Sequence, residues 1–152
     1  ARVMNTSTGS LAGVMPVSVS ASTDDATPAV HWWNGRWWVG TASNGNPARV
    51  FSSPTPSNFT EVFSQASNSA PAFADDWVAI SNGDRVLFRH LFADGGVEAS
   101  SIQGHYSSAF RPSVAVDTLG RPLAVSVCRY GIGEGENARV DGSVYCSTHK
   151  VA

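Results

Sequence analysis

The chain has little charge and no long apolar run. Only 14% of its 152 residues are charged, well below the roughly 25% of an ordinary soluble domain. The formal net charge is -2, which gives no general attraction to nucleic acid or to an anionic membrane. No apolar stretch approaches the roughly 20 residues that a membrane-spanning helix needs. We therefore expect neither nucleic-acid binding nor membrane insertion.

Cysteine is scarce, and histidine has no ligand spacing. The two cysteines, Cys128 and Cys146, are too few for a disulfide scaffold. Both lie in β-like runs separated by one loop, so a disulfide across a hairpin and a pair of buried thiols both remain open. The four histidines show no spacing to each other or to cysteine that is typical of a metal site. We therefore predict no metal and no cofactor.

Turn-forming residues and short apolar runs are abundant instead. The chain contains 14 glycines and 8 prolines, and 42% of its residues are hydrophobic. No segment of a dozen residues shows a helical period, whereas alternation of apolar and polar residues recurs throughout. These features predict an all-β fold, with residues 1–13 as a polar N-terminal arm and residues 14–152 as a single domain. A first strand is predicted at residues 14–20, where Pro16 favours a sheet edge.

Three segments of the chain begin alike. Pro28, Pro71 and Pro112 each start a short strand, and they stand 43 and then 41 residues apart. Each strand leads into a turn and a second strand, and a third strand follows in every segment. A fourth strand is predicted in the first two segments, at residues 59–63 and 97–102, but the third segment ends before one could form. The predicted repeats are residues 28–69, 70–110 and 111–152.

Four antiparallel strands in every forty-odd residues is the periodicity of β-propeller blades. A β-sandwich or jelly roll is the alternative. Three blades are too few to close a ring, since known propellers have about four to eight. We therefore expect a homo-oligomer or a larger assembly to complete the fold. The predicted strand at residues 14–20 could be exchanged into the third repeat, which lacks its fourth strand.

The segment after the third strand of the first repeat carries a motif-like pattern, SSPTPSNF, at residues 52–59. With the proline-led strands it resembles the sialidase-like, or BNR-repeat, β-propellers, whose blades carry an Asp box, S-x-D-x-G-x-T-W, between their third and fourth strands. Ser52 and the aromatic Phe59 keep the outer positions, whereas Pro54 and Pro56 replace the aspartate and the glycine. The resemblance implies a propeller fold. Sialidase activity would further require an arginine cluster, a Tyr-Glu pair and an acidic aspartate.

Four of the five tryptophans lie in one stretch, HWWNGRWW, at residues 31–38. Asn-Gly between apolar residues predicts a hairpin with a two-residue turn, because both turn positions take positive φ. Counting outward from the turn gives the cross-strand neighbours. The predicted pairs are Trp33 with Arg36, Trp32 with Trp37, His31 with Trp38, and Val30 with Val39.

Side chains alternate across this hairpin, so the paired residues form two sides. We expect the side with Val30, Trp32, Trp37 and Val39 to face the core. The other side carries two indole rings, a guanidinium and an imidazole, which can stack on a sugar ring and hydrogen-bond its hydroxyls. We predict that it binds ligand, although packing between blades would also place tryptophans on both sides. The candidate ligand-binding residues are His31, Trp33, Arg36 and Trp38.

No catalytic residue is predicted. A glycosidase needs two carboxylates roughly 5 to 10 Å apart, and no spacing singles out a pair here. Three carboxylates stand in predicted turns, where aspartate is favoured for its backbone hydrogen bonds. The loop of residues 129–142 offers three more for calcium, but we expect these to be solvated or to contact a neighbouring subunit. The carboxylates in question are Asp75, Asp76, Asp117, Glu134, Glu136 and Asp141.

Together these features predict a non-catalytic recognition module, a lectin-like β-propeller that binds glycan or cell-surface carbohydrate and acts as an oligomer. A structural virion or surface-assembly protein, such as a decoration or fibre component, is the first alternative, because a polar arm and an incomplete repeat suit a larger assembly. A sialidase-like glycoside hydrolase fragment is the second alternative. We expect an extracellular location or a place on a virion surface, where receptor binding would occur.

Overall fold

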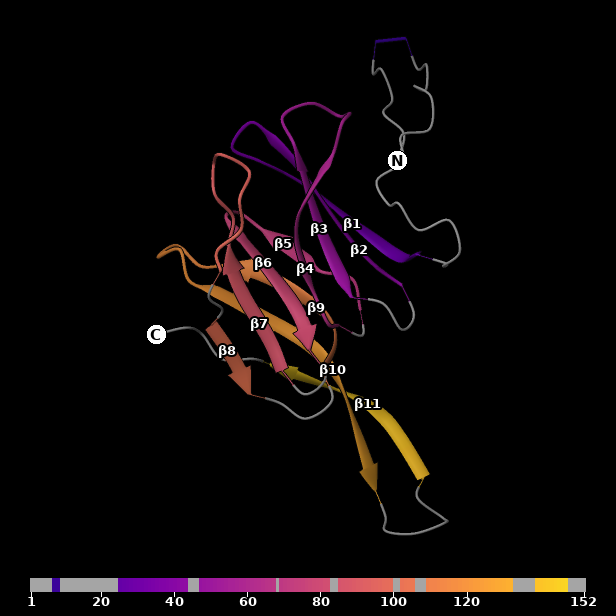
Figure 1. Ribbon diagram of the computed structural model, residues 1–152. Coiled ribbons are helices and arrows are strands. Elements are labelled where there is room, and N and C mark those ends of the chain that lie inside the picture. The colour runs from indigo at the N-terminus through magenta and orange to yellow at the C-terminus, as the bar shows by residue number, and fades with distance from the viewer. Residues whose placement is uncertain are drawn as a thin grey trace.

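The computed structural model describes residues 7–8, 25–43, 47–67, 69–82, 85–99, 102–105, 109–132 and 139–147. All regular structure in these residues is β-strand, and every pair of neighbouring strands is antiparallel (Figure 1). The predicted all-β class is therefore confirmed. The described part of the chain contains no helix that is long and apolar enough to cross a membrane. The predicted strand at residues 14–20, and the arm of residues 1–13 apart from residues 7–8, lie outside the described residues.

The described strands form three sheets that follow one another along the chain. The first sheet has four strands in the order of the sequence, β1 (Asp25–Trp33), β2 (Arg36–Ser43), β3 (Ala48–Ser53) and β4 (Thr60–Gln65). The second sheet has the same order in β5 (Ala72–Ala74), β6 (Trp77–Asn82), β7 (Arg85–His90) and β8 (Ile102–His105). The third sheet contains β9 (Ala109–Val116), β10 (Pro122–Ile132) and β11 (Arg139–Ser147), with β10 in the middle.

One sheet therefore corresponds to each predicted repeat, and one strand differs from its prediction. The fourth strand of the second repeat was expected at residues 97–102, but β8 begins only at Ile102. Before it, Leu91 and Val97 form an isolated antiparallel bridge that closes a tight turn after β7. Two glycines, Gly95 and Gly96, occupy this turn, and Gly95 has a φ of 102° that other residues rarely adopt. Val97, the first residue of the predicted strand, thus belongs to this turn.

The prolines that open the repeats lie at the edge of each sheet. Pro28 is in β1, Pro71 directly precedes β5, and Pro112 is in β9. Each of these strands has a hydrogen-bonded neighbour on one side only among the described strands. Proline has no N–H to donate to a ladder, so an edge strand is the place in a sheet that tolerates it. The repeated proline therefore marks the same edge of all three sheets.

The three sheets pack face to face in chain order. We call the contact between the first and second sheets the first junction, and that between the second and third sheets the second junction. The first junction buries Trp38, Ala42, Ala48, Val50, Val78, Ile80 and Leu91. The second junction buries Trp77, Ala79, Val86, Phe88 and Ala124, with Val114 and Val116 packed against them. The second sheet is thus covered on both faces, which explains why five of the six residues of β6 are buried.

Two details tighten the first junction. Gly40 lies against β5, and a Cβ atom there would be only 3.0 Å from both Pro71 and Phe73, so the bare backbone allows the two sheets to approach. On the other side, the Arg89 guanidinium lies 4.5 Å from the centre of the Phe63 ring in β4. Burial lowers the pKa of Arg89, and the nearby Glu98 opposes that shift. Arg89 therefore joins the two sheets through a cation–π contact.

The two cysteines stand on neighbouring strands of the third sheet but not directly opposite each other. Cys128 of β10 pairs with Val144 of β11, and Cys146 pairs with Ser126. The two positions are therefore diagonal neighbours in the ladder, and such neighbours are about 7–8 Å apart. A directly opposed pair, as a cross-hairpin disulfide would suggest, does not occur in this register.

Candidate functional site

The tryptophan-rich stretch forms the predicted hairpin. Asn34 and Gly35 make the turn with φ values of 47° and 73°, the left-handed conformation that asparagine and glycine tolerate best. All four predicted cross-strand pairs are present in the β1–β2 ladder. The turn residues and the two-residue period therefore fix which side chains share a side of this hairpin.

One side of the hairpin faces the second sheet. His31 stacks on Phe73, with the rings 5.8 Å apart and nearly parallel, and its Nε2 donates a hydrogen bond of 2.8 Å to the carbonyl oxygen of Asp75. Trp38 is 0% exposed, and Trp33 is partly buried against the residues of the first junction. These contacts are internal to the protein.

Arg36 belongs to the same side. Its Nε donates to the Ser52 hydroxyl at 3.0 Å, and its guanidinium lies against Gly95 in the turn after β7. A Cβ atom at Gly95 would come within 2.4 Å of Arg36 Nη2, so the glycine makes room for the arginine. The four predicted ligand residues are thus gathered together, but all of them contact protein, and Trp38 has no surface left for a ligand.

The opposite side of the hairpin, which we call the outer face, carries Val30, Trp32, Trp37 and Val39. Val30 is 60% exposed and Trp32 is 52% exposed, whereas Trp37 is half-buried and Val39 is buried. The Trp32 and Trp37 rings lie 4.9 Å apart and are tilted by 58°. The outer face is therefore where this hairpin presents aromatic surface.

The prediction that the outer face is the core side was wrong for Val30 and Trp32. The alternation of side chains was right, but alternation alone does not say which side is inward. Tryptophan occurs on both sides of this hairpin, so hydrophobicity does not decide between them. The inward side is set by where the second sheet packs, which depends on residues more than thirty positions away.

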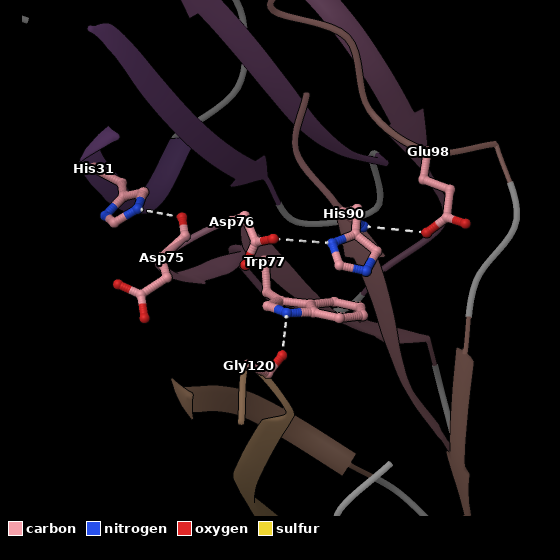
Figure 2. A network of polar contacts seen from close by, with 7 residues as sticks. All are labelled: His31, Asp75, Asp76, Trp77, His90, Glu98 and Gly120. Atoms are coloured by element: carbon pink, nitrogen blue, oxygen red, sulfur yellow. Dashed lines mark hydrogen bonds and ion pairs between the residues drawn. The ribbon is translucent and has the colours of Figure 1, made fainter. Parts of the chain in front are cut away.

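Hydrogen bonds near the hairpin turns fasten each sheet to the next (Figure 2). In the first pair of sheets, His31 donates to the carbonyl of Asp75 in the β5–β6 turn. In the second pair, Trp77 Nε1 donates to the carbonyl of Gly120 in the β9–β10 turn at 3.1 Å. Both bonds connect an aromatic nitrogen to a turn about one repeat later. They fix the turns of the three sheets relative to one another.

A carboxylate and an imidazole lie within this network. Asp76 Oδ2 is 3.2 Å from His90 Nδ1, and the backbone N–H of His90 donates to Glu98 at 3.4 Å (Figure 2). Such a carboxylate orients an imidazole in hydrolase triads. Here, however, the indole of Trp77 lies against the His90 ring, with centroids 3.6 Å apart. The pair is therefore best explained as a structural bond that joins β7 to the β5–β6 turn.

Asp117 closes the turn between β9 and β10. Its carboxylate accepts hydrogen bonds from the backbone N–H of Arg121 and Leu119 and from the Arg121 side chain, at 2.8 to 3.0 Å. The backbone bond from Arg121, followed by the side-chain bond from the same residue, lowers the pKa of Asp117 to about 2. Aspartate in this turn is thus structural, as its position predicted. The side chains of Glu134, Glu136 and Asp141 lie outside the described residues.

The turn after β7 contains a motif that sequence reasoning missed. Asp94 Oδ1 accepts a hydrogen bond of 2.9 Å from the N–H of Gly96, two residues further on, in the segment between β7 and β8. In the first repeat, Ser53 and Thr55 instead bond the carbonyl of Ser57. The signal was the Asp-Gly-Gly run at residues 94–96, which lies between the predicted third and fourth strands of the repeat and for which no turn was proposed.

A shallow apolar cleft lies where the proline-led strands meet. Its volume is about 400 Å³. No charged side chain lines it, so it lacks the polar groups that orient a sugar in a binding site. The lining residues are Ala29, Val30, Ala70, Pro71, Ala72, Phe73 and Pro112.

Within the described residues, no group of three or more His, Cys, Asp or Glu side chains could hold a metal ion. No protein-family model, curated protein or solved structure matches the chain. Two of the exposed large hydrophobic side chains among the described residues, Val30 and Trp32, lie on the outer face.

Trp38 and Trp32 are expected to contribute very differently to stability. Trp38→Ala leaves a large cavity in the first junction and should lower the free energy of unfolding by about 3–5 kcal/mol. Trp32→Ala should lower it by about 1 kcal/mol or less. Trp38→Phe should cost less than Trp38→Ala, because no acceptor among the described residues satisfies the Trp38 Nε1–H. Urea unfolding at low protein concentration measures all three. Equal losses for Trp32→Ala and Trp38→Ala would contradict the assignment of the two sides.

The Asp117 turn is expected to make stability depend on pH in acid. The pKa of Asp117 in the folded protein, about 2, is below its usual 3.8, so its contribution is complete above about pH 4 and is lost as the pH falls towards 2. Asp117→Asn should lower the thermal midpoint at pH 7 and flatten its decline between pH 4 and 2. Asp75→Asn, at an exposed turn residue, is the matched control. An unchanged acid profile in Asp117→Asn would refute the role of this carboxylate.

Proposed function

We propose that this protein is a non-catalytic recognition module of the β-propeller type that works as an assembly of chains. The observation that carries the proposal is the repeated junction between sheets, together with an outer face that has no sheet packed on it among the described residues. A β-sandwich has two sheets, each with one solvent face. Here a middle sheet is covered on both faces, which favours blades stacked in series.

The outer face of the first sheet corresponds by register to the face of the second sheet that is buried in the first junction. The hairpin of the first sheet closes with the pair Trp33–Arg36, and that of the second closes with Ala74–Trp77, both around two-residue turns. Positions counted from these pairs are therefore equivalent. In the second sheet, the equivalents of the outer face pack against the first sheet. The equivalent positions are Trp32 and Phe73, Trp37 and Val78, and Val39 and Ile80.

This equivalence indicates what the outer face is built to contact. Phe73, Val78 and Ile80 receive a neighbouring sheet, so we infer that Trp32 and Trp37 receive another sheet of the same kind. A large exposed aromatic side chain beside an exposed valine is typical of a protein interface. Assembly through this face suits a decoration or fibre component on a virion or another extracellular surface, where the assembled module would carry out recognition.

The assembly proposal predicts a mass greater than that of one chain. Light scattering at micromolar concentration should give a defined oligomer for the native protein. Trp32→Glu should dissociate it, because a central tryptophan commonly contributes 2 kcal/mol or more, which is about 30-fold in affinity. Phe92→Glu is the matched control, since Phe92 is 47% exposed in the turn after β7, and that turn contacts the hairpin through Gly95 and Arg36 on the side opposite to the outer face. A monomeric native protein that stays monomeric at high concentration would rule out assembly through copies of this chain.

Carbohydrate is the second candidate partner, and the exposed indole of Trp32 favours it. A half-exposed indole braced by Trp37 offers a flat apolar surface on which the C–H face of a sugar can stack. The carbohydrate surface then lies on the outer face and not on the side of Trp38. A sugar and a packed sheet would compete for the same residues, so the two candidates are separable.

Titration with a panel of glycans, followed by tryptophan fluorescence, tests the carbohydrate candidate. A glycan bound at the outer face should give a saturable change that weakens about tenfold or more in Trp32→Ala, a difference of about 1.4 kcal/mol. Phe92→Ala should keep the native response. No saturable change with any glycan, in native protein whose assembly state has been measured, counts against this candidate.

A further inference from the structure

The third sheet also has one face without a packed neighbour among the described residues. In the β9–β10 ladder, Val114 pairs with Ala124 and Ala115 pairs with Leu123. Val114 and Ala124 pack in the second junction. Because side chains alternate, Ala115 and Leu123 stand on the opposite side, and both are exposed, Leu123 by 42%. We call the surface of Ser113, Ala115 and Leu123 the far face.

The same hairpin position faces the next sheet in both internal junctions. This position is the first residue after the hairpin turn. In the first sheet it is Arg36, which lies against Gly95 of the second sheet's β7–β8 segment, and in the second sheet it is Trp77, which donates to the carbonyl of Gly120 in the third sheet's β9–β10 turn. In the third sheet, the backbone bond from Asp117 N–H to the carbonyl of Arg121 closes the hairpin. Arg121 is thus the first residue after the β9–β10 turn, the position that Arg36 and Trp77 have in the first and second sheets. Leu123 is two residues further along the strand, so its side chain lies on the same side of the sheet as that of Arg121.

Of the three described sheets, the first therefore presents a face of the kind that receives a preceding sheet, and the third presents a face of the kind that contacts a following one. We propose that the far face of one chain packs on the outer face of a second copy, head to tail. This inference rests on the proposed assembly and names its contact surfaces. The new junction continues the first and second junctions between molecules.

Side-chain sizes on the two faces are complementary. The second junction sets the large rings of Trp77 and Phe88 against Ala124 and two valines. In the proposed contact the sizes are reversed: the large side chain is Trp32 of the outer face, and the small ones are Ser113 and Ala115 of the far face. Pairing large with small residues across facing sheets is what fills a sheet-to-sheet core without voids.

A head-to-tail contact uses two different surfaces of each chain, so it differs from a symmetric dimer contact. Every added copy leaves one outer face and one far face free until the ring closes. The proposed contact therefore predicts that substitution of either face alone prevents assembly. It also predicts that a residue of the outer face contacts the far face of the second chain and does not contact the same residue of that chain.

Cysteine crosslinking between two differently sized versions of the chain tests this arrangement. Both carry Cys128→Ser and Cys146→Ser. One further carries Trp32→Cys and the other Leu123→Cys. After mixing, subunit exchange and oxidation with copper–phenanthroline, which removes the two thiol protons and two electrons, the expected product is a disulfide between the two versions. Phe92→Cys in place of Leu123→Cys is the control and should give background crosslinking only.

Association of the otherwise native chain gives a second measurement that does not depend on the cysteine variants folding. Leu123→Glu should dissociate the assembly as fully as Trp32→Glu does. Crosslinking of Trp32→Cys chains to each other would overturn the head-to-tail contact in favour of a symmetric one. Assembly that Trp32→Glu abolishes but Leu123→Glu leaves intact would overturn this inference and spare the proposed function. A monomeric native chain would overturn both, and would assign the outer face to a different protein or to further sheets of a longer one.

Discussion

Burial of the second sheet between its two neighbours is the contact on which the rest of this structure depends. A four-stranded antiparallel sheet with apolar residues on both faces cannot remain in water on either side. Val78 and Ile80 point to the first sheet while Trp77 and Phe88 point to the third, so one strand pair contributes to two cores. Loss of either junction would expose one apolar face of the second sheet to water, so the stability of the second sheet depends on both of its neighbours.

The polar contacts serve this stacking. An imidazole and an indole each bind a turn carbonyl of the following sheet, and a guanidinium occupies the space beside a glycine. Hydrogen bonds of this kind add little net stability because water could replace them. Their direction matters more, since they fix how far each sheet is rotated on its neighbour. The hairpin HWWNGRWW is therefore mainly a packing element on one side, and its function must be sought on the other.

Sequence patterns predicted this fold at the level of strands and pairs. Asn-Gly and a two-residue period were sufficient for the register of β1 and β2, and the repeated proline located the first strand of each repeat. These patterns could not predict whether the Trp32 side or the Trp38 side of the hairpin is buried, because that depends on where the second sheet packs, and the second sheet is distant in sequence. The Asp94 turn was missed for a local reason, since alternation locates the strands on either side of it and does not describe the hydrogen bonds of the turn between them. The candidate residues were brought together as predicted, but around protein partners.

The prolines at the edge of each sheet have a further effect on the architecture. β5 contacts both β1 and β9, so three strand edges lie close enough to compete for one another's backbone groups. Edge strands without proline could pair with one another through backbone hydrogen bonds, and the three sheets would then form one continuous sheet. Proline at the same edge of every repeat removes one N–H donor there and opposes such pairing. The three sheets stay separate, and the apolar cleft lies between their edges. The stack can therefore be extended without breaking any strand ladder, because the described sheets contact one another through side chains and turns and do not share strand pairing.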